Sequence, residues 1–318
     1  MNKNVFNRLL FLAAAGAVIL FSTSLNARGN SPDTVRVYYL GGQSNMDGFG
    51  FNRDLPESLA HINGNVWIFH GNQAGDDLPG GGLGLWAPLQ AGHGTGFQSD
   101  GTANVYSDRF GLELSLASRL QELYPGDRIA LIKYSRGGTS IDSLATGRFG
   151  CWEPDYQGSS GINQYDNFLL TVNTAMNAAD INGDGTKDIL IPAGIVWMQG
   201  ESDASFNEEI ADRYYDNLKR LMDLIRAGFR CDDLPVVIGK ISDSWDDPDD
   251  GKVWDYGELV QYAQEKYART DGNAAIVRDT RYYKYSDPWH YDSEGYLDLG
   301  KRFAEELYRL EHRLNIRP

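Results

Sequence analysis

Residues 35–46 read Val-Arg-Val-Tyr-Tyr-Leu-Gly-Gly-Gln-Ser-Asn-Met. The β-branched and aromatic run at 35–40 predicts a buried strand, and the two glycines after it predict a tight turn. Open α/β sheets bind ligands beyond the carboxyl ends of their strands, so Ser44 is a candidate nucleophile. A Gly-Gly-x-Ser stretch is more often a simple turn, so this interpretation depends on partners elsewhere in the chain.

The composition is typical of a globular protein with an acidic surface. The chain has 318 residues, of which 42% are hydrophobic and 23% charged, which is enough for a sizeable core. Its formal net charge is −15. Because such a surface repels phosphate backbones and anionic lipids, we expect no nucleic-acid partner and no membrane partner after signal cleavage. A neutral or cationic substrate is easier to accommodate.

The first 27 residues have the order of a secretory signal peptide. Lys3 and Arg8 precede an apolar stretch at 9–21, which small and polar residues follow up to Ala27. The apolar stretch is short for a membrane span, which needs ~20 residues, and an uncleaved anchor is the alternative. We therefore expect a signal peptide at 1–27, a single domain at 28–318, and a secreted or periplasmic protein.

Strand-like and helix-like runs alternate along the rest of the chain. We predict strands at 35–40, 129–134, 194–198, 235–241 and 274–277, and helices at 110–123, 167–179, 208–227, 256–267 and from Ser293, which can cap the last helix. This alternation predicts a mostly parallel sheet with helices on both faces. The glycine-rich stretch 52–102 has little periodicity and is expected to form loops.

Four polar segments follow the predicted strands and are expected to meet at one edge of the sheet. They contain Ser44, a glycine turn at 136–140, the segment Gln-Gly-Glu-Ser-Asp at 199–203, and Asp-Pro-Trp-His at 287–290. Acyl transfer needs such a set: a serine, a histidine that accepts its proton, a carboxylate that orients the histidine, and donors for the oxyanion.

These segments resemble the blocks of the SGNH hydrolase superfamily, and more closely the sialate O-acetylesterase-like group, which includes the acetylxylan esterases of carbohydrate esterase family 6. The resemblance runs from about residue 35 to 310, with the blocks in the family's order. It implies a three-layer α/β/α sandwich with a mostly parallel, flavodoxin-like sheet. It also implies roles for three residues: Ser44 as nucleophile, His290 as general base and then acid, and Asp287 as the group that orients His290.

The resemblance further implies an oxyanion hole formed by the Ser44 and Gly137 N–H groups and the Gln199 side chain. The superfamily usually has asparagine where this chain has Gln199, as in the acetylxylan-esterase branch, and the choice between Gly137 and Gly138 is open by one position. Supporting residues around these groups are expected to be Gln43, Asn45, Gly138, Glu201 and Asp203. The last two are alternatively simple surface charges, and Asp287 and His290 alone would fit an ordinary turn before a helix.

A second motif lies at 180–188, where oxygen-bearing side chains stand at alternate positions and glycine allows a sharp turn. An EF-hand needs a glutamate at its twelfth position, which here is Ile191, so that loop type is excluded. A short structural calcium loop remains, and an acidic turn between a helix and a strand is the equal alternative. The calcium ligands would be Asp180, Asn182, Asp184, the Thr186 carbonyl and Asp188. Catalysis itself is expected to need no cofactor.

Other candidates have simpler interpretations. Cys151 and Cys231 could form a disulfide in an oxidising compartment or remain free thiols. Three histidines outside the motifs are expected to lie solvated in loops: His61, His70 and His93. Tryptophans could stack on sugar rings, but most are expected to pack the core or a loop base; the candidates are Trp67, Trp86, Trp152 and Trp289.

The prediction is a secreted serine carbohydrate esterase that removes O-acetyl or similar short acyl groups from a glycan such as acetylated xylan or sialic acid. A lipase- or thioesterase-like member of the same fold is one alternative, although residues 52–102 show little sign of an apolar groove. A calcium-dependent carbohydrate-binding module with an inactive site is the other.

Overall fold

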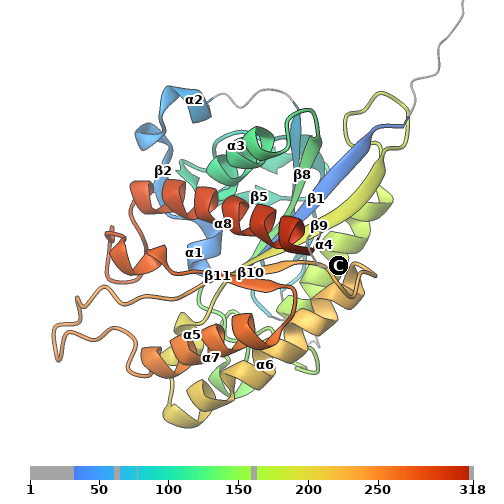
Figure 1. Cartoon of the computed structure of the whole chain (residues 1–318). Helices are drawn as coiled ribbons and strands as arrows, with labels where there is room; N and C mark the ends of the chain where they lie inside the picture. Colours follow the sequence, from blue (N-terminus) through green and yellow to red (C-terminus); the bar gives the residue numbers. More distant parts are fainter. Residues whose placement is uncertain (1–31, 61–64, 77, 159–162, 315–318) are drawn as a thin grey trace, which may run out of the picture. The chain divides into compact units, whose positions relative to one another are not determined.

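A seven-stranded sheet forms the centre of the computed structural model, which describes residues 32–60, 65–76, 78–158 and 163–314 (Figure 1). The predicted signal peptide and His61 lie outside these residues. Across the sheet the strand order is β11-β10-β9-β1-β8-β3-β4, with every neighbouring pair parallel except β3 and β4. The strands are β1 (Thr34–Gly42), β3 (Val66–His70), β4 (Trp86–Pro88), β8 (Arg128–Ser135), β9 (Ile189–Met198), β10 (Val236–Gly239) and β11 (Ala274–Val277).

The direction of chain progression reverses at β1. Five parallel strands, taken in sequence as β1, β8, β9, β10 and β11, lie in the spatial order 2-1-3-4-5 of a flavodoxin-like sheet. β1 therefore lies between β8 and β9, and the chain passes first to the β8 side of β1 and then crosses to the β9 side. Such a switch point opens a crevice beyond the carboxyl ends of the strands, and Ser44 follows β1 directly into it.

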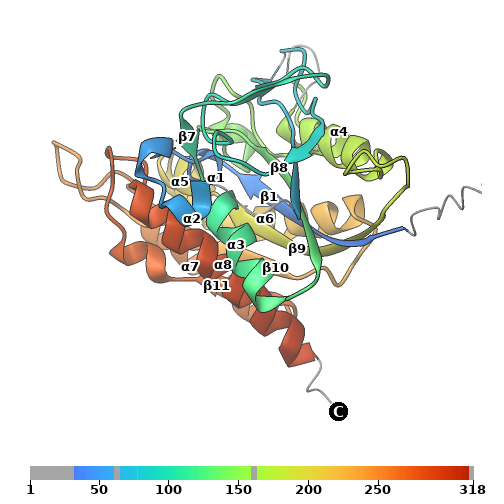
Figure 2. The same cartoon turned by 90° about the horizontal axis from the view of Figure 1, so that it is seen from above.

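Helices cover both faces of the sheet, as predicted. Successive side chains of a strand point to opposite faces, so adjacent residues of β1 meet different helices. A Cβ at Gly194 would meet both Tyr38 and Leu307 of α8, whereas Tyr39 contacts Phe168 of α4. Figures 1 and 2 show α3 and α8 together on one face and α6 and α7 on the other. The long helices are α3 (Glu113–Leu123), α4 (Gln164–Asn177), α6 (Glu208–Gly228), α7 (Gly257–Thr270) and α8 (Ser293–Leu314).

Short helices, 3₁₀ turns and two-residue strands lie in the loops that connect the main elements. The brief helices are α1 (Ser44–Asp47), α2 (Glu57–Ala60) and α5 (Glu201–Ala204), with single 3₁₀ turns at Asn52–Asp54, Ser143–Ala145 and Asp279–Tyr282. Two small two-stranded sheets pair β2 (Gly50–Phe51) with β7 (Arg109–Phe110) and β5 (Gln98–Ser99) with β6 (Asn104–Val105).

The structure corrects three local predictions. The stretch 52–102 is not only loops, because it contributes β3 and β4 to the main sheet. His70 and His93 are not solvated: they are fully buried, with their Nδ1 atoms 3.1 Å apart. The side chain that caps α8 is Asp292, which accepts the Gly295 N–H, while Ser293 bonds Asp54 and the Phe51 N–H instead.

Residues from Pro32 onward belong to one compact unit. Within the described part of the chain, no helix has the length and apolarity that crossing a membrane requires. Cys151 is buried, Cys231 is partly buried, and both are free thiols in this structure.

Gly42 offers a test of the close packing at the end of β1. A Cβ at this position would lie 1.9 Å from the Met198 carbonyl oxygen, and its φ of +143° disfavours any side chain. We expect Gly42→Ala to lower the free energy of unfolding by about 3 kcal/mol in urea denaturation, because backbone would have to move. Gly126→Ala is the matched control: its φ is also positive, at +94°, but nothing lies within 4 Å of the added atom. A loss no larger than the control's would contradict the packing argument.

Candidate active site

Ser44 is the first residue of α1, directly beyond the carboxyl end of β1. The Gln43 N–H donates to the Met198 carbonyl at 2.9 Å, which fixes the turn against β9. The Ser44 residue is 9% exposed, so the hydroxyl sits in a recess rather than on an open surface. Its backbone lies at a helix start, where N–H groups have no intrahelical acceptor and can serve an anion.

His290 and Asp287 form the expected pair. The His290 Nδ1 lies 2.8 Å from Asp287 Oδ2, and Asp287 Oδ1 accepts the N–H groups of Trp289 and His290. Burial alone would raise the pKa of Asp287, but these bonds and the histidine outweigh burial and leave the pKa lowered. The carboxylate is therefore ionised near neutral pH, and it leaves Nε2 as the free nitrogen of the imidazole.

Asn45 and Phe49 hold the His290 loop over α1. Asn45 Nδ2 donates to the Trp289 carbonyl at 3.2 Å, and Asn45 Oδ1 accepts the Tyr291 N–H at 3.4 Å, so the residues on both sides of His290 are clasped by the neighbour of Ser44. The Phe49 ring stacks on the imidazole with centroids 3.5 Å apart and planes 6° apart. Among the described residues, the Ser44 hydroxyl has no hydrogen-bond partner. Bonds of this kind often form only once substrate is bound.

Gly137 lies against Ser44, as the sequence predicted. A Cβ on Gly137 would come within 3.2 Å of the Ser44 Cβ, which explains the glycine at this position. The Gly137 N–H, however, donates to Asp47 Oδ2 at 2.8 Å. Asp47 is buried, and burial raises its pKa although nearby Lys133 and Arg136 act in the opposite direction. The expected oxyanion donor is thus engaged by a carboxylate of α1 in this structure.

Gln199 lies at the centre of a buried network. Its side-chain amide donates to Asp203 Oδ2 at 2.6 Å, and it is also 3.2 Å from Gln43 Oε1 and from the Thr139 carbonyl. Its own oxygen accepts the hydroxyl of Tyr214. Gln199 is fully buried, and through these bonds its amide connects the ends of β1, β8 and β9.

Two acidic residues next to Gln199 are buried rather than surface charges. Asp203 accepts the N–H groups of Ile141 and Asp142, and burial raises its pKa to about 6. Glu201 accepts the Asn45 amide at 2.8 Å, and burial raises its pKa as well. Both carboxylates are therefore bonded to neighbouring loops and are not surface charges, and their supporting role in an active site stays a prediction. Gly138, the other glycine of this turn, has a φ of +72°.

Lys133 is a supporting residue that the sequence analysis missed. It is fully buried on β8, and its ammonium bonds Glu113 of α3, the Asp47 carbonyl and the His93 carbonyl at 2.8–2.9 Å. The signal was present: a lysine inside the apolar run 129–134 must have buried partners. Burial also lowers the pKa of the nearby His93 to about 3, so that imidazole stays neutral.

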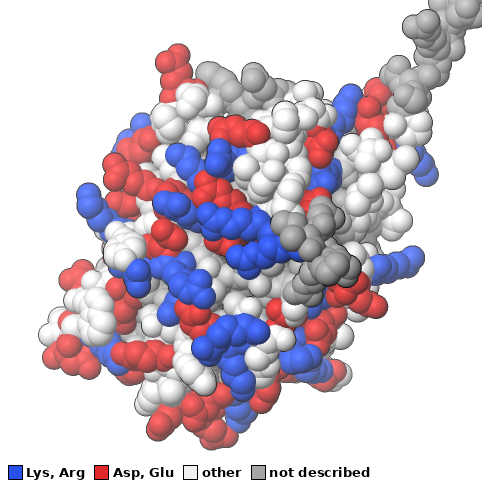
Figure 3. Space-filling model, in the orientation of Figure 1, with Lys and Arg blue, Asp and Glu red and all other residues white. Residues whose placement is uncertain are grey.

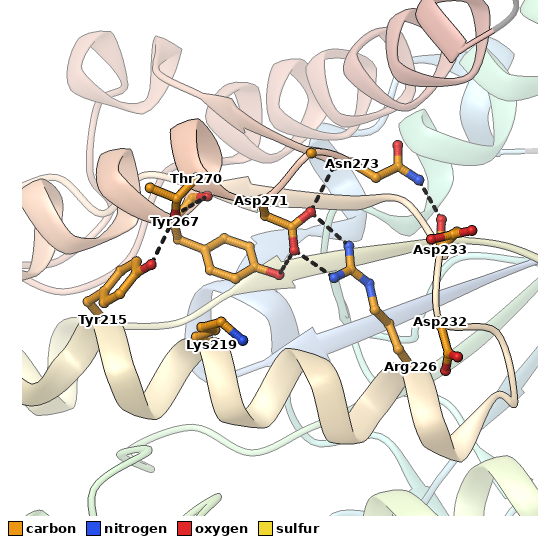
Figure 4. Close-up of a pocket in the computed structure, with 10 residues that line it drawn as sticks. Tyr215, Lys219, Arg226, Asp232, Asp233, Tyr267, Thr270, Asp271 and Asn273 are labelled. Carbon is orange, nitrogen blue, oxygen red and sulfur yellow. Dashed lines mark hydrogen bonds and ion pairs between the residues drawn. The ribbon is translucent and has the colours of Figure 1, made fainter.

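A separate cleft lies away from this site. It measures about 490 Å³ and sits between α6 and the residues that precede β10 and β11, at the amino ends of the strands (Figure 4). Arg226 pairs there with Asp271, which also accepts the Tyr267 hydroxyl, and Asn273 donates to the Asp233 carbonyl. The ion pair and these hydrogen bonds hold the segments before β10 and β11 together.

The loop at 180–188 folds as a chain of tight turns. Asp180 accepts the N–H groups of Asp184 and Gly185, Asp184 accepts that of Thr186, and Asp188 accepts that of Ile181. Across the described residues, no three histidine, cysteine, aspartate or glutamate side chains are grouped to hold a metal ion. In this structure the side-chain oxygens of Asp180, Asn182 and Asp184 accept backbone N–H groups, and Asp184 also accepts the Asn182 side-chain amide.

The tryptophans divide as expected. Trp152 is fully buried and Trp67 nearly so, and Trp86 donates to the Ala175 carbonyl. Trp289 is 51% exposed next to His290.

On the face seen in Figure 3, positive side chains of α3 and α8 lie among carboxylates, with Arg119 paired to Glu305 and Arg302 to Asp298.

Comparison with known proteins identifies the family. Residues 34–309 match the family model described as carbohydrate esterase, sialic acid-specific acetylesterase. The chain belongs to this family. It is a carboxylic ester hydrolase that acts on acetyl groups of carbohydrates. No curated protein matches the chain.

Solved structures show the same fold at low sequence identity. A protein from Arabidopsis thaliana is 18% identical over 88% of this chain and 99% of its own, with a TM-score of 0.59. A carbohydrate acetylesterase from Xanthomonas citri is 18% identical over 88% of this chain and 57% of its own, with a TM-score of 0.55. NanS is 15% identical over 89% of this chain and 99% of its own, with a TM-score of 0.53.

Asn45 allows positioning to be separated from stability. We expect Asn45→Ala to lower kcat on a small acetyl ester at least tenfold, because the His290 loop loses its clasp, and to lower the free energy of unfolding by about 2 kcal/mol. Asn273→Ala, at the opposite edge of the sheet, is the control that loses a hydrogen bond without touching this loop. Equal kcat losses in the two variants would mean that the effect is general destabilisation.

Proposed function

We propose that the chain is a secreted serine esterase that removes O-acetyl groups from a glycan through an acyl-enzyme. The observation that carries the proposal is the Asp287–His290 pair held by Asn45 and Phe49 over the helix that begins with Ser44. Family membership supports the ester chemistry and the carbohydrate substrate. The export step rests on the predicted signal peptide at 1–27.

In the proposed reaction, the Ser44 oxygen attacks the ester carbonyl and His290 Nε2 takes the hydroxyl proton. The resulting imidazolium is stabilised by the ionised Asp287. The C–O bond to the sugar then breaks, and the sugar oxygen receives that proton as it leaves. A water molecule then attacks the acetyl-serine while His290 takes its proton. His290 returns that proton to the Ser44 oxygen as the acyl bond breaks and acetate departs.

For the oxyanion we propose the N–H groups of Ser44 and Gly137 and the side chain of Gln199. The Gly137 N–H and the Gln199 amide bond protein acceptors in this structure. To stabilise the oxyanion, Gly137 has to give up its bond to Asp47, and Gln199 has to give up one of the bonds of its amide. The two 3.2 Å contacts of the Gln199 amide are the weaker ones and the easier to exchange. A lipase-like activity remains the alternative within the fold.

The first test compares Ser44→Ala with the wild type on p-nitrophenyl acetate, butyrate and octanoate. We expect the wild type to prefer acetate and the variant to lose ~10³-fold or more in kcat/KM. Ser118→Ala, which lines a separate cleft beside α3, is the matched control. Retention of activity in Ser44→Ala would remove Ser44 as the nucleophile, and a preference for octanoate would favour the lipase-like alternative.

We further propose that catalysis needs no cofactor and that any calcium bound at 180–188 is structural, with Asp180, Asn182, Asp184, the Thr186 carbonyl and Asp188 as ligands. EDTA is then expected to leave kcat unchanged below the unfolding temperature and to lower Tm if the site is filled. Loss of all activity on chelation, restored by calcium, would contradict the cofactor-free mechanism. Loss of sugar binding on chelation would favour the binding-module alternative.

A further inference from the structure

The loop after β10 presents a tryptophan in an unusual conformation. Trp245 is 64% exposed and has a φ of +60°, a region that bulky residues rarely occupy. The Asp243 carboxylate imposes it by accepting the N–H groups of Trp245, Val253 and Trp254 at 2.8–3.2 Å. The backbone that carries this exposed indole is thus fixed by hydrogen bonds at a cost in backbone strain, and such strain gathers at ligand sites.

This loop adjoins the proposed catalytic residues. β10 runs parallel to β1, so its carboxyl end opens at the same edge of the sheet as Ser44. The Ser244 hydroxyl donates to the Pro288 carbonyl at 2.8 Å, which ties the loop to the segment that carries His290. Figure 1 shows the loop, in orange, projecting beyond the sheet beside the segment between β11 and α8.

A cleft of about 440 Å³ lies between the two segments. Its lining combines aromatic rings with hydrogen-bonding groups, which suits a sugar ring with apolar faces and a rim of hydroxyls. On the other side of Asp287, Trp289 is 51% exposed with its ring 6.5 Å from that of His290. The cleft is lined by Ser244, Trp245, Asp246, Tyr283, Lys284, Tyr285, Ser286 and Asp287.

The charge of the loop after β10 favours a neutral sugar over an acidic one. Residues 243–250 contain five aspartates and no lysine or arginine, and Lys252, the next cation of the loop, is paired with Glu258. Lys284 is the cation in the cleft lining, against Asp246 and Asp287. An acidic sugar such as sialic acid or a uronic acid would bring a further negative charge beside these carboxylates, which is unfavourable.

We infer that this cleft is a subsite for a further ring of a neutral glycan chain, with Trp245 as its stacking surface and the exposed Trp289 between the cleft and His290. The substrate class is then an acetylated neutral oligosaccharide or polysaccharide rather than free sialic acid. The inference rests on the proposed function and deepens it, since the acetylated sugar would lie at Ser44 and the chain would continue over Trp289 to Trp245.

Binding can be measured without turnover in the Ser44→Ala protein by titrating tryptophan fluorescence or heat release with neutral xylohexaose and with an acidic galacturonate hexamer. We expect the neutral hexamer to bind at least tenfold more tightly than the acidic one, and Trp245→Ala in this background to weaken the neutral hexamer about tenfold. Tyr262→Ala is the matched control, because Tyr262 is an equally exposed ring on α7. Equal or tighter binding of the acidic hexamer, no binding of either, or no effect of Trp245→Ala would overturn the subsite.

Turnover gives a second readout in the Ser44-containing enzyme. The ratio of kcat/KM on acetylated xylohexaose to that on p-nitrophenyl acetate should fall about tenfold in Trp245→Ala and stay constant in Tyr262→Ala. An unchanged ratio in Trp245→Ala would contradict the subsite while leaving the esterase proposal intact. Absence of all ester hydrolysis would instead contradict the proposed function, and the binding titration would still decide the subsite.

Discussion

The site depends on the close approach of β1 and β9 at Gly42, the last residue of β1. Gly42 leaves no room for a Cβ beside the Met198 carbonyl, and the next N–H bonds that carbonyl. The chain therefore turns sharply at the switch point of the sheet and starts a helix with Ser44. Everything else in the site is built around that turn: Gly137 packs against the serine from β8, and Gln199 closes the other side from β9.

Buried polar networks then fix the loops that surround Ser44. Lys133 joins the carbonyl of Asp47 to Glu113 of α3, and Asn45 joins Glu201 to the segment that carries His290. A buried charge or amide without partners is costly, so each member of these networks constrains the loop that supplies its partner. These networks thus hold the Ser44 and His290 loops in place, which the proposed general-base catalysis requires.

The sequence predicted the sheet and the helices because their apolar periodicity is local, and ordered motifs placed Ser44, Asp287 and His290 at one edge. It did not predict β3, since the stretch 52–102 is glycine-rich and β3 is a short strand buried by tertiary contacts. Nor did it predict that Asp47 would bond the Gly137 N–H, because that contact joins residues ninety positions apart. The positive φ of Trp245 depends on the carboxylate of Asp243, and spacing alone carries no sign of it.

The proposed reaction requires that His290 activates Ser44 at the end of β1. Labelling of the folded protein with a fluorophosphonate, followed by intact mass and peptide mapping, tests this directly. We predict one label per chain on the peptide that contains Ser44, and labelling at least ~10³-fold slower in His290→Ala. A label on another residue, or equal labelling of the His290→Ala protein, would contradict the account.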